Sequence, residues 1–171
     1  MDNGEEAWRQ RAARRAASAL PEVWSLLDGI SDPEIPVVSL WDLGILQDVR
    51  RDGDTLVVTI TPTYCGCPAM TEIEQDIERR LRQAGHEPLR IETRLSPPWS
   101  TDMMSPEARQ ALEGYGIAPP CSACTAGGGQ PACPHCGSQE TRPVSEFGST
   151  ACKALWQCDA CQEPFDYFKH I

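Results

Sequence analysis

The sequence lacks any apolar run long enough to cross a membrane. Its 171 residues are 40% hydrophobic, but no stretch approaches the ~20 consecutive apolar residues that a bilayer requires. The first residues, Met-Asp-Asn-Gly-Glu-Glu, are acidic and have no apolar segment of the kind found in a secretory signal. We therefore expect a cytoplasmic protein that does not bind membranes.

Positive charge is also scarce. The chain has 15 Lys and Arg against 25 Asp and Glu, a net charge of −10, and residues 1–120 contain no lysine. Binding to nucleic acid depends on clustered positive charge that can neutralise phosphates. The composition therefore argues against a nucleic-acid partner.

Patterns typical of catalytic sites are missing as well. The sequence has no Gly-rich phosphate loop, no nucleophile–base pattern and no set of His and carboxylate residues suited to a catalytic metal. We therefore predict that the chain is not itself an enzyme.

Cysteine, in contrast, is plentiful and concentrated at one end. Seven of the nine cysteines lie within residues 121–171, which begin inside a run rich in Gly and Pro that cannot hold a regular helix or a central strand. We predict an α+β domain over residues 1–118 with an N-terminal helical extension, a linker over 119–131 and a small β module over 132–171. In a reducing cytoplasm such paired cysteines bind metal more often than they form disulfides.

Hydrophobic periodicity predicts the elements of the first domain. Helices are expected over residues 5–18, 22–28 and 69–84, and strands over 43–49, 55–61 and 89–95. An apolar stripe in the first helical region comprises Trp8, Ala12, Ala16, Ala19 and Val23. A further short helix should open at Ser105-Pro106. The order helix–strand–strand–helix–strand is that of a small α+β sandwich.

A loop between a strand and a helix carries Cys65 and Cys67. Pro68 suits the first position of the helix, so Cys67 is expected at or near the helix N-terminus. There the backbone N–H groups and the helix dipole would lower the pKa of the thiol and make it reactive or able to bind metal. The alternative is that Cys65 and Cys67 are small buried residues that close the loop and have no chemical role. Asp32 and Glu34 form the other polar cluster, for which solvated or capping carboxylates are the simpler interpretation.

Two Cys-x-x-Cys pairs near the C-terminus form the strongest chemical signal. Cys133 and Cys136 are separated from Cys158 and Cys161 by 21 residues, and such pairs make tight turns that together supply four thiolates to zinc. Residues 142–148 and 154–157 between them suit short strands, so we predict a zinc ribbon. Because all four ligands come from the protein, this zinc would be structural and not catalytic.

Three further cysteines leave alternatives open. Cys121 and Cys124 could complete a rival site with Cys133 and Cys136, could pair with each other, could bind a second metal or could remain free. We favour the ribbon quartet because Cys158 and Cys161 would otherwise have no partners. Cys152 is expected to be a packed strand residue. His135 is not expected to be a ligand.

Three motifs in order resemble the metal–sulfur cluster biosynthetic family. They are Asp32-Pro-Glu-Ile-Pro-Val-Val-Ser, Asp42-Leu-Gly-Ile and Thr61-Pro-Thr-Tyr-Cys-Gly-Cys-Pro-Ala, and the resemblance covers residues 20–96. It implies a small α+β domain that takes part in iron–sulfur cluster biogenesis. By this likeness Cys67 matches the family's cysteine before proline, and Asp32 and Glu34 lie in its acidic loop. Cys65 departs from the small residue expected there.

The tail, joined to this domain, resembles a narrower group, the family of D subunits of bacterial phenylacetyl-CoA epoxidase (ring-oxygenase) systems. The segments that carry the likeness are Pro97-Pro-Trp-Ser-Thr-Asp102, Tyr115-Gly-Ile-Ala-Pro-Pro120, Cys133-Pro-His-Cys-Gly-Ser, Ser145-Glu-Phe-Gly-Ser-Thr-Ala-Cys152 and Glu163-Pro-Phe-Asp-Tyr-Phe-Lys169. The resemblance implies a non-catalytic accessory protein in aerobic phenylacetate degradation, with protein partners in the iron–sulfur reductase and the di-iron oxygenase.

Two functions follow from these resemblances. In the first, Cys67, with or without Cys65, transiently holds iron or an iron–sulfur cluster for insertion into a partner, while the ribbon docks that partner. In the second, the chain is a structural or protein-interaction subunit without metal transfer. A ferredoxin-like tail that holds iron is a third interpretation, although the ribbon spacing favours zinc. The sequence is compatible with a homodimer.

Overall fold

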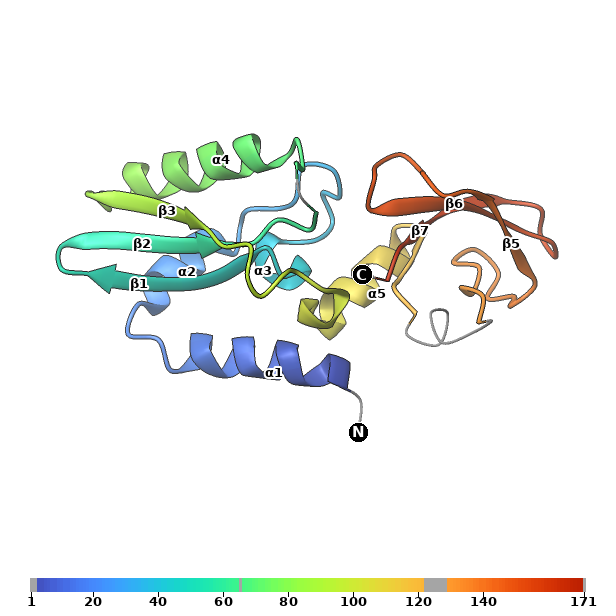
Figure 1. The fold of residues 1–171 in the computed structure, drawn as a ribbon, viewed down its shortest axis with the longest axis horizontal. Coiled ribbons are helices and arrows are strands. Elements are labelled where there is room, and N and C mark those ends of the chain that lie inside the picture. The colour runs from blue at the N-terminus through green and yellow to red at the C-terminus, as the bar shows by residue number, and fades with distance from the viewer. Residues whose placement is uncertain (1–2, 65, 122–128, 171) are drawn as a thin grey trace. The chain divides into compact units, whose positions relative to one another are not determined.

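The structure, a computed structural model, describes residues 3–64, 66–121 and 129–170 and divides into two compact units, Met1–Ser105 and Pro106–Ile171. The elements of the first unit are α1 (Asn3–Ala16), α2 (Pro21–Leu27), α3 (Leu40–Leu43), β1 (Leu46–Asp52), β2 (Thr55–Ile60), α4 (Met70–Gln83), β3 (Leu89–Thr93) and the 3₁₀ turn η1 (Thr101–Met103) (Figure 1). Those of the second are α5 (Pro106–Gly114), β4 (Ile117–Ala118), β5 (Thr141–Ser145), β6 (Lys153–Cys158) and β7 (Pro164–Phe168). No helix in these described ranges is both long and apolar enough to cross a bilayer.

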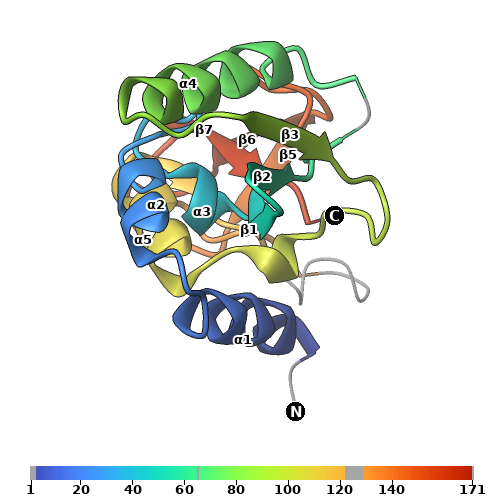
Figure 2. The same ribbon diagram turned by 90° about the vertical axis from the view of Figure 1, so that its left-hand side faces the viewer.

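The first unit is built on a three-stranded sheet in the order β1–β2–β3. The hairpin strands β1 and β2 are antiparallel, and α4 carries the chain across to β3, which is parallel to β2. Figure 2 shows α2 and α4 on the same side of this sheet. The buried side chains that face each other across this layer come from both helices and from β2: Val23, Leu27, Ile73, Ile77, Leu81, Leu56, Val58 and Ile60.

The opposite face of the sheet is covered in part by ion pairs. Val57 and Thr59 alternate with the residues that face the helices, and both are fully buried. Arg50 of β1 reaches Glu92 of β3 at 2.9 Å, and so the pair spans the central strand. Arginine stems shield apolar surface while the charged head stays in water, which helps to explain how the central strand is buried on both faces.

The helical extension α1 is fixed by a buried arginine. Arg11 is 2% exposed, and its guanidinium donates hydrogen bonds to the carbonyl oxygens of Trp41 at 2.8 Å, of Leu46 at 2.7 Å and of Met103. The guanidinium carbon also lies 4.2 Å from the centre of the Trp41 ring, a favourable cation–π geometry. One side chain therefore links α1 to α3, β1 and η1.

The second unit is a four-stranded sheet in the order β4–β7–β6–β5. Strands β5, β6 and β7 form an antiparallel meander, and the two-residue strand β4 adds to the edge of β7 in parallel. One buried hydrophobic cluster of this unit contains two cysteines among its six members: Ala118, Cys133, Ala154, Cys158, Phe165 and Tyr167.

The structure confirms the predicted α+β class and most elements to within a few residues. The helix expected over 69–84 is α4, and the one expected at Ser105-Pro106 is α5. The short α3, which overlaps the start of the strand expected from residue 43, was missed, as were β4 and β7. The apolar stripe was wrong at Ala16 and Ala19, which are exposed, because α1 buries Arg11 instead.

The division into units also differs from the expected end of the first domain at residue 118. The boundary falls between Ser105 and Pro106, because α5 packs on β4 and β4 pairs with β7. Residues 106–118 therefore belong with the C-terminal sheet.

Replacing Arg11 by Ala should lower the free energy of unfolding by about 2–4 kcal/mol, because three buried carbonyl oxygens lose their donor. Arg14→Ala is the matched control on the same helix, since Arg14 is exposed, and it should change stability by no more than about 0.5 kcal/mol. Urea unfolding followed by tryptophan fluorescence measures both. Equal stability of the two variants would contradict the anchoring role of Arg11.

Candidate functional site: a four-thiolate centre and a separate cysteine loop

Four cysteines of the second unit converge on one point. The sulfur atoms of Cys133, Cys136, Cys158 and Cys161 all lie within 4.8 Å of one another. The sulfurs of Cys133 and Cys161 are 3.8 Å apart, and those of Cys136 and Cys158 are 3.6 Å apart. Four thiolates at about 2.3 Å from a tetrahedral ion would be ~3.8 Å apart, whereas a disulfide requires about 2.05 Å. The geometry is that of a metal-binding group and not of two cystines.

Each pair of cysteines is held by the same backbone turn. The carbonyl of Cys133 accepts a hydrogen bond from the N–H of Gly137 at 2.8 Å, and the carbonyl of Cys158 accepts one from the N–H of Gln162 at 3.0 Å. In both turns the fourth residue after the first cysteine has a positive φ, 75° at Gly137 and 65° at Gln162. Glycine adopts this conformation without strain, but glutamine does so only at a cost of about 1 kcal/mol.

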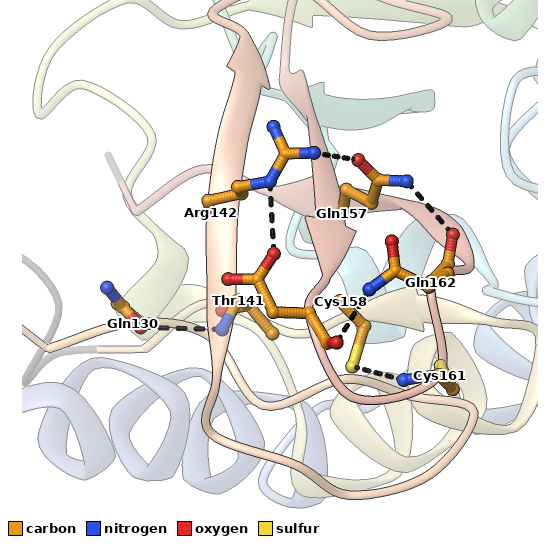
Figure 3. A network of polar contacts seen from close by, with 8 residues as sticks. Gln130, Thr141, Arg142, Gln157, Cys158, Cys161 and Gln162 are labelled. Atoms are coloured by element: carbon orange, nitrogen blue, oxygen red, sulfur yellow. Dashed lines mark hydrogen bonds and ion pairs between the residues drawn. The ribbon is translucent and has the colours of Figure 1, made fainter.

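A polar network holds the strained second turn in place (Figure 3). The side chain of Gln162 donates to the carbonyl of Asp159 at 2.6 Å, and the side chain of Gln157 donates to the carbonyl of Gln162 at 3.0 Å. Arg142 of β5 contacts both the Gln157 side chain and, at 3.0 Å, the Asp159 carboxylate. These contacts tie the turn to two strands, and so they position Cys158 and Cys161.

The thiols of this quartet differ in acidity. The backbone N–H of Cys161, 3.5 Å from the Cys158 sulfur, is the largest influence that lowers the pKa of Cys158, to about 7. For Cys161 a backbone hydrogen bond from Glu163 lowers the pKa, but desolvation and the neighbouring cysteines raise it by more, to about 12. Without a cation the first thiolate therefore opposes ionisation of the others, and a dication would allow all four to ionise.

The loop that holds Cys67 lies in the first unit. Cys67 is half-buried, and the loop runs from the end of β2 to the start of α4. The carboxylates of Glu34 and Asp32 lie close enough to influence its thiol, so the structure brings together three of the residues singled out from the sequence. Cys65 lies outside the described residues.

Pro68 was wrongly predicted as the first residue of the helix, although Cys67 does lie near the helix N-terminus. Helix α4 begins at Met70 with Ala69 as its N-cap, and so Cys67 lies two residues before the cap. Desolvation by burial raises the pKa of the Cys67 thiol. The backbone N–H of Ala69 and a side-chain hydrogen bond from Tyr64 act in the opposite direction, whereas the nearby Glu34 and Asp32 raise the pKa further. The expected lowered pKa is therefore wrong as well.

The two carboxylates beside Cys67 differ in their roles. Asp32 is 5% exposed, and its Oδ1 accepts hydrogen bonds from the N–H groups of Glu34 and Ile35, both at 2.9 Å, so it shapes the loop. The carboxylate of Glu34 is half-buried and makes no hydrogen bond or ion pair with the part of the chain that the structure describes. Glu34 is therefore the carboxylate more able to meet an incoming cation.

Among the described residues, Cys121 and Cys152 do not belong to the four-cysteine group. Cys121 is a half-buried free thiol, and Cys124 lies outside the described residues. Cys152 is buried directly before β6, and its sulfur lies 3.0 Å from the Thr150 hydroxyl oxygen. His135 is exposed and does not belong to the four-cysteine group.

Sequence reasoning missed the residues that support both groups. Gln162 gives no signal in the sequence, because only the fold forces a non-glycine residue to a positive φ there. Tyr64 stood inside the recognised motif, directly before Cys65, but no rule of spacing marks it as a hydrogen-bond partner of Cys67.

Comparison with known proteins agrees with this two-part organisation. Residues 20–87 match the family described as iron-sulfur cluster assembly protein, and residues 118–169 match the PaaD zinc beta ribbon domain. Over 95% of its length the chain is 46% identical to an Escherichia coli (strain K12) protein named as the D subunit of a "Putative 1,2-phenylacetyl-CoA epoxidase", and it covers 99% of that protein. The chain belongs to this family of epoxidase D subunits.

Two further proteins resemble the N-terminal part of this member of the D-subunit family. One is the Fe-S protein maturation auxiliary factor YitW of Bacillus subtilis (strain 168), 32% identical over 53% of this chain and 89% of that protein. The other is the crystal structure of a domain of unknown function, DUF59, from Bacillus anthracis, with 28% identity and a TM-score of 0.50 over 61% of this chain and 95% of that one.

Replacing Cys158 by Ser should release the metal ion of the quartet and unfold the C-terminal sheet while leaving the first unit folded, because the ion and the core of the second unit share this cysteine. Elemental analysis gives the metal content, and amide NMR spectra report the two units separately. Cys121→Ser is the matched control and should keep the ion. An unchanged metal content in Cys158→Ser would overturn the assignment, and loss of the ion in the control would favour the rival quartet.

The raised pKa of Cys67 has a measurable consequence. At neutral pH its thiol should be alkylated more slowly than a free cysteine, and the rate should rise as the pH increases through its raised pKa, since only the thiolate reacts. Glu34→Gln removes one of the charges that raise the pKa, so it should speed alkylation at neutral pH. Peptide-resolved mass spectrometry isolates Cys67 from the other thiols. A rate that exceeds that of free cysteine would refute the direction of the shift.

Proposed function

We propose that the chain is a non-catalytic accessory component of a phenylacetyl-CoA epoxidase system that helps to load iron or an iron–sulfur cluster into a partner component. The names of two relatives support the two halves of this proposal: one is an epoxidase subunit that matches over nearly the whole chain, and the other is an Fe-S protein maturation factor that matches the N-terminal part. The proposed partners are the iron–sulfur reductase and the di-iron oxygenase.

The observation that carries the proposal is the grouping of Cys67 with Glu34 and Asp32, which come from two separate loops of the first unit. Thiolates are the preferred ligands of iron–sulfur clusters, and carboxylates favour any cation that approaches. Burial is the main cause that keeps the empty thiol protonated, and the negative field of the carboxylates adds to it. The same negative field attracts a metal ion, which then displaces that proton to solvent. The site is therefore inert when empty and becomes a ligand when its cargo arrives.

A site that holds iron or a cluster only weakly suits a carrier better than a permanent metal centre. Cys67 offers one thiolate on a half-buried loop, whereas the quartet in the second unit supplies four. Cargo held by few protein ligands keeps coordination positions that a partner's cysteines can take over. Cys65, as a second thiolate of the same loop, would strengthen the hold without closing the site.

We assign zinc to the quartet. Cys133, Cys136, Cys158 and Cys161 give a closed set of four thiolates in the paired turns typical of structural zinc, with no position left for substrate. In this arrangement the ion stabilises the second unit and takes no part in transfer. The ribbon then serves as the module that contacts a partner.

A second candidate function is that of a component that contacts the oxygenase without handling metal. It is favoured by an apolar groove of about 350 Å³ on the ribbon sheet, lined by aromatic side chains that include Trp156 and Tyr167. Phe147 at this groove is 66% exposed, and its ring centre lies 4.9 Å from Nζ of Lys169. Exposed apolar patches with a polar rim are typical of protein-interaction sites.

Replacing Cys67 by Ser separates the two functions. The variant should fold normally, because the side chain is half-buried and nearly the same size, but it should lower the cluster content of the co-expressed reductase several-fold. Iron and sulfide analysis of the purified reductase measures this content, with Cys121→Ser as the control thiol. Normal cluster content with intact association of the components would reject the carrier function and favour the interaction component.

A further inference from the structure

A cavity in the first unit is lined by arginines that have no acidic partner. It has a volume of about 530 Å³ and lies between α1, β1 and the segment that follows β3. Its charged lining consists of three arginines, Arg11, Arg14 and Arg94, against one carboxylate, Asp48. The local balance is thus positive in a chain whose net charge is −10.

These arginines are exceptional within the molecule. Most other arginines of the described ranges are ion-paired to carboxylates within 4 Å: Arg15, Arg50, Arg79, Arg82, Arg90 and Arg142. The side chains of Arg14 and Arg94 make no ion pair and no hydrogen bond with the residues that the structure describes, although Asp48 lines the same cavity. Unpaired arginines that converge on one cavity are available to a ligand.

The third arginine, Arg11, is a buried positive charge without a counter-ion in contact. Its charge is met by carbonyl oxygens and by the face of the Trp41 ring, and its Nε has no hydrogen-bond acceptor in the described structure. Burial lowers the pKa of Arg11 to about 9, and the neighbouring Arg14 contributes to this lowering, while Asp42 acts in the opposite direction. An anion beside the two arginines would relieve their repulsion.

The cavity is built largely from parts of the chain that lie outside the cluster-assembly family match. That match covers residues 20–87, whereas α1 contributes Gln10, Arg11 and Arg14, and the segment after β3 contributes Arg94 and Ser100. The cavity shares only Thr61 with the loop that holds Cys67, and it differs from that loop in its chemistry.

We propose that this cavity binds the phosphate group of a small molecule. Guanidinium groups match the oxygens of phosphate in geometry and remain charged at neutral pH, and a group that carries close to two negative charges balances the surplus of two positive charges in the lining. The volume is within the range of small-molecule sites and exceeds what one phosphate needs. The ligand is therefore a phosphate ester, and the polar side chains of Gln10 and Ser100 are placed to contact its remaining part.

The test is an amide NMR titration of the full-length, metal-loaded protein with inorganic phosphate and, separately, with adenosine monophosphate. Chloride keeps the ionic strength constant, because phosphate binding by exposed charges is otherwise confounded by screening. Saturable shifts are expected at Gln10, Gln47 and Ser100, with tighter binding of the ester than of phosphate. Binding of phosphate alone, with no gain from the ester, would overturn the assignment of an ester ligand.

The variants give the residue-level control. Arg14→Gln combined with Arg94→Gln should weaken binding at least tenfold and keep the fold, since both side chains are exposed. Arg82→Gln together with Arg79→Gln removes the same charge from α4, outside this cavity, and should change affinity less than twofold. The absence of saturable binding of either probe, or equal weakening by both double variants, would refute the site.

Discussion

The second unit depends on one electrostatic requirement: four sulfur atoms that lie within 4.8 Å of one another need a positive ion between them. Two of the same cysteines, Cys133 and Cys158, belong to a buried hydrophobic cluster of the unit. The ion and the hydrophobic core are therefore not separate sources of stability. A unit of this size gains little from apolar burial alone, so the turns, the strands and even the strained Gln162 are arranged around the site of the ion.

The molecule contains two different sulfur environments. In the quartet, backbone N–H groups lower the pKa of Cys158, while the pKa values of Cys136 and Cys161 are raised, so that one thiol is ready to ionise before a cation brings in the others. Around Cys67, burial and the carboxylates of Glu34 and Asp32 raise the pKa, which keeps the thiol protonated until a cation arrives. Cysteine sulfur thus serves a fixed structural metal centre in the second unit and, in our proposal, an exchangeable metal site in the first.

The sequence predicted those features that depend on local patterns. The helix expected over 69–84, the strand expected over 55–61 and the Cys-x-x-Cys spacing all depend on residues near one another in the chain. The structure contains α4, β2 and the four-cysteine group at these places. Features set by tertiary packing were not predictable in this way. In the sequence, Arg11 resembles a solvent-exposed helix residue, and only the folded chain brings Trp41 and Met103 into contact with it. The acidity of Cys67 depends on where α4 begins, and the position of Pro68 predicted a start two residues before the observed one.

The two turns of the quartet share an asymmetry of exposure. In each, the first cysteine is buried, Cys133 and Cys158, whereas the second reaches the surface, with Cys136 exposed and Cys161 partly so. Chelators and oxidants in solution therefore meet only the outer pair of ligands. Loss of the ion would start by release of an outer sulfur, with the inner two still bound, and this half-open state is the one from which the centre can either close again or be destroyed.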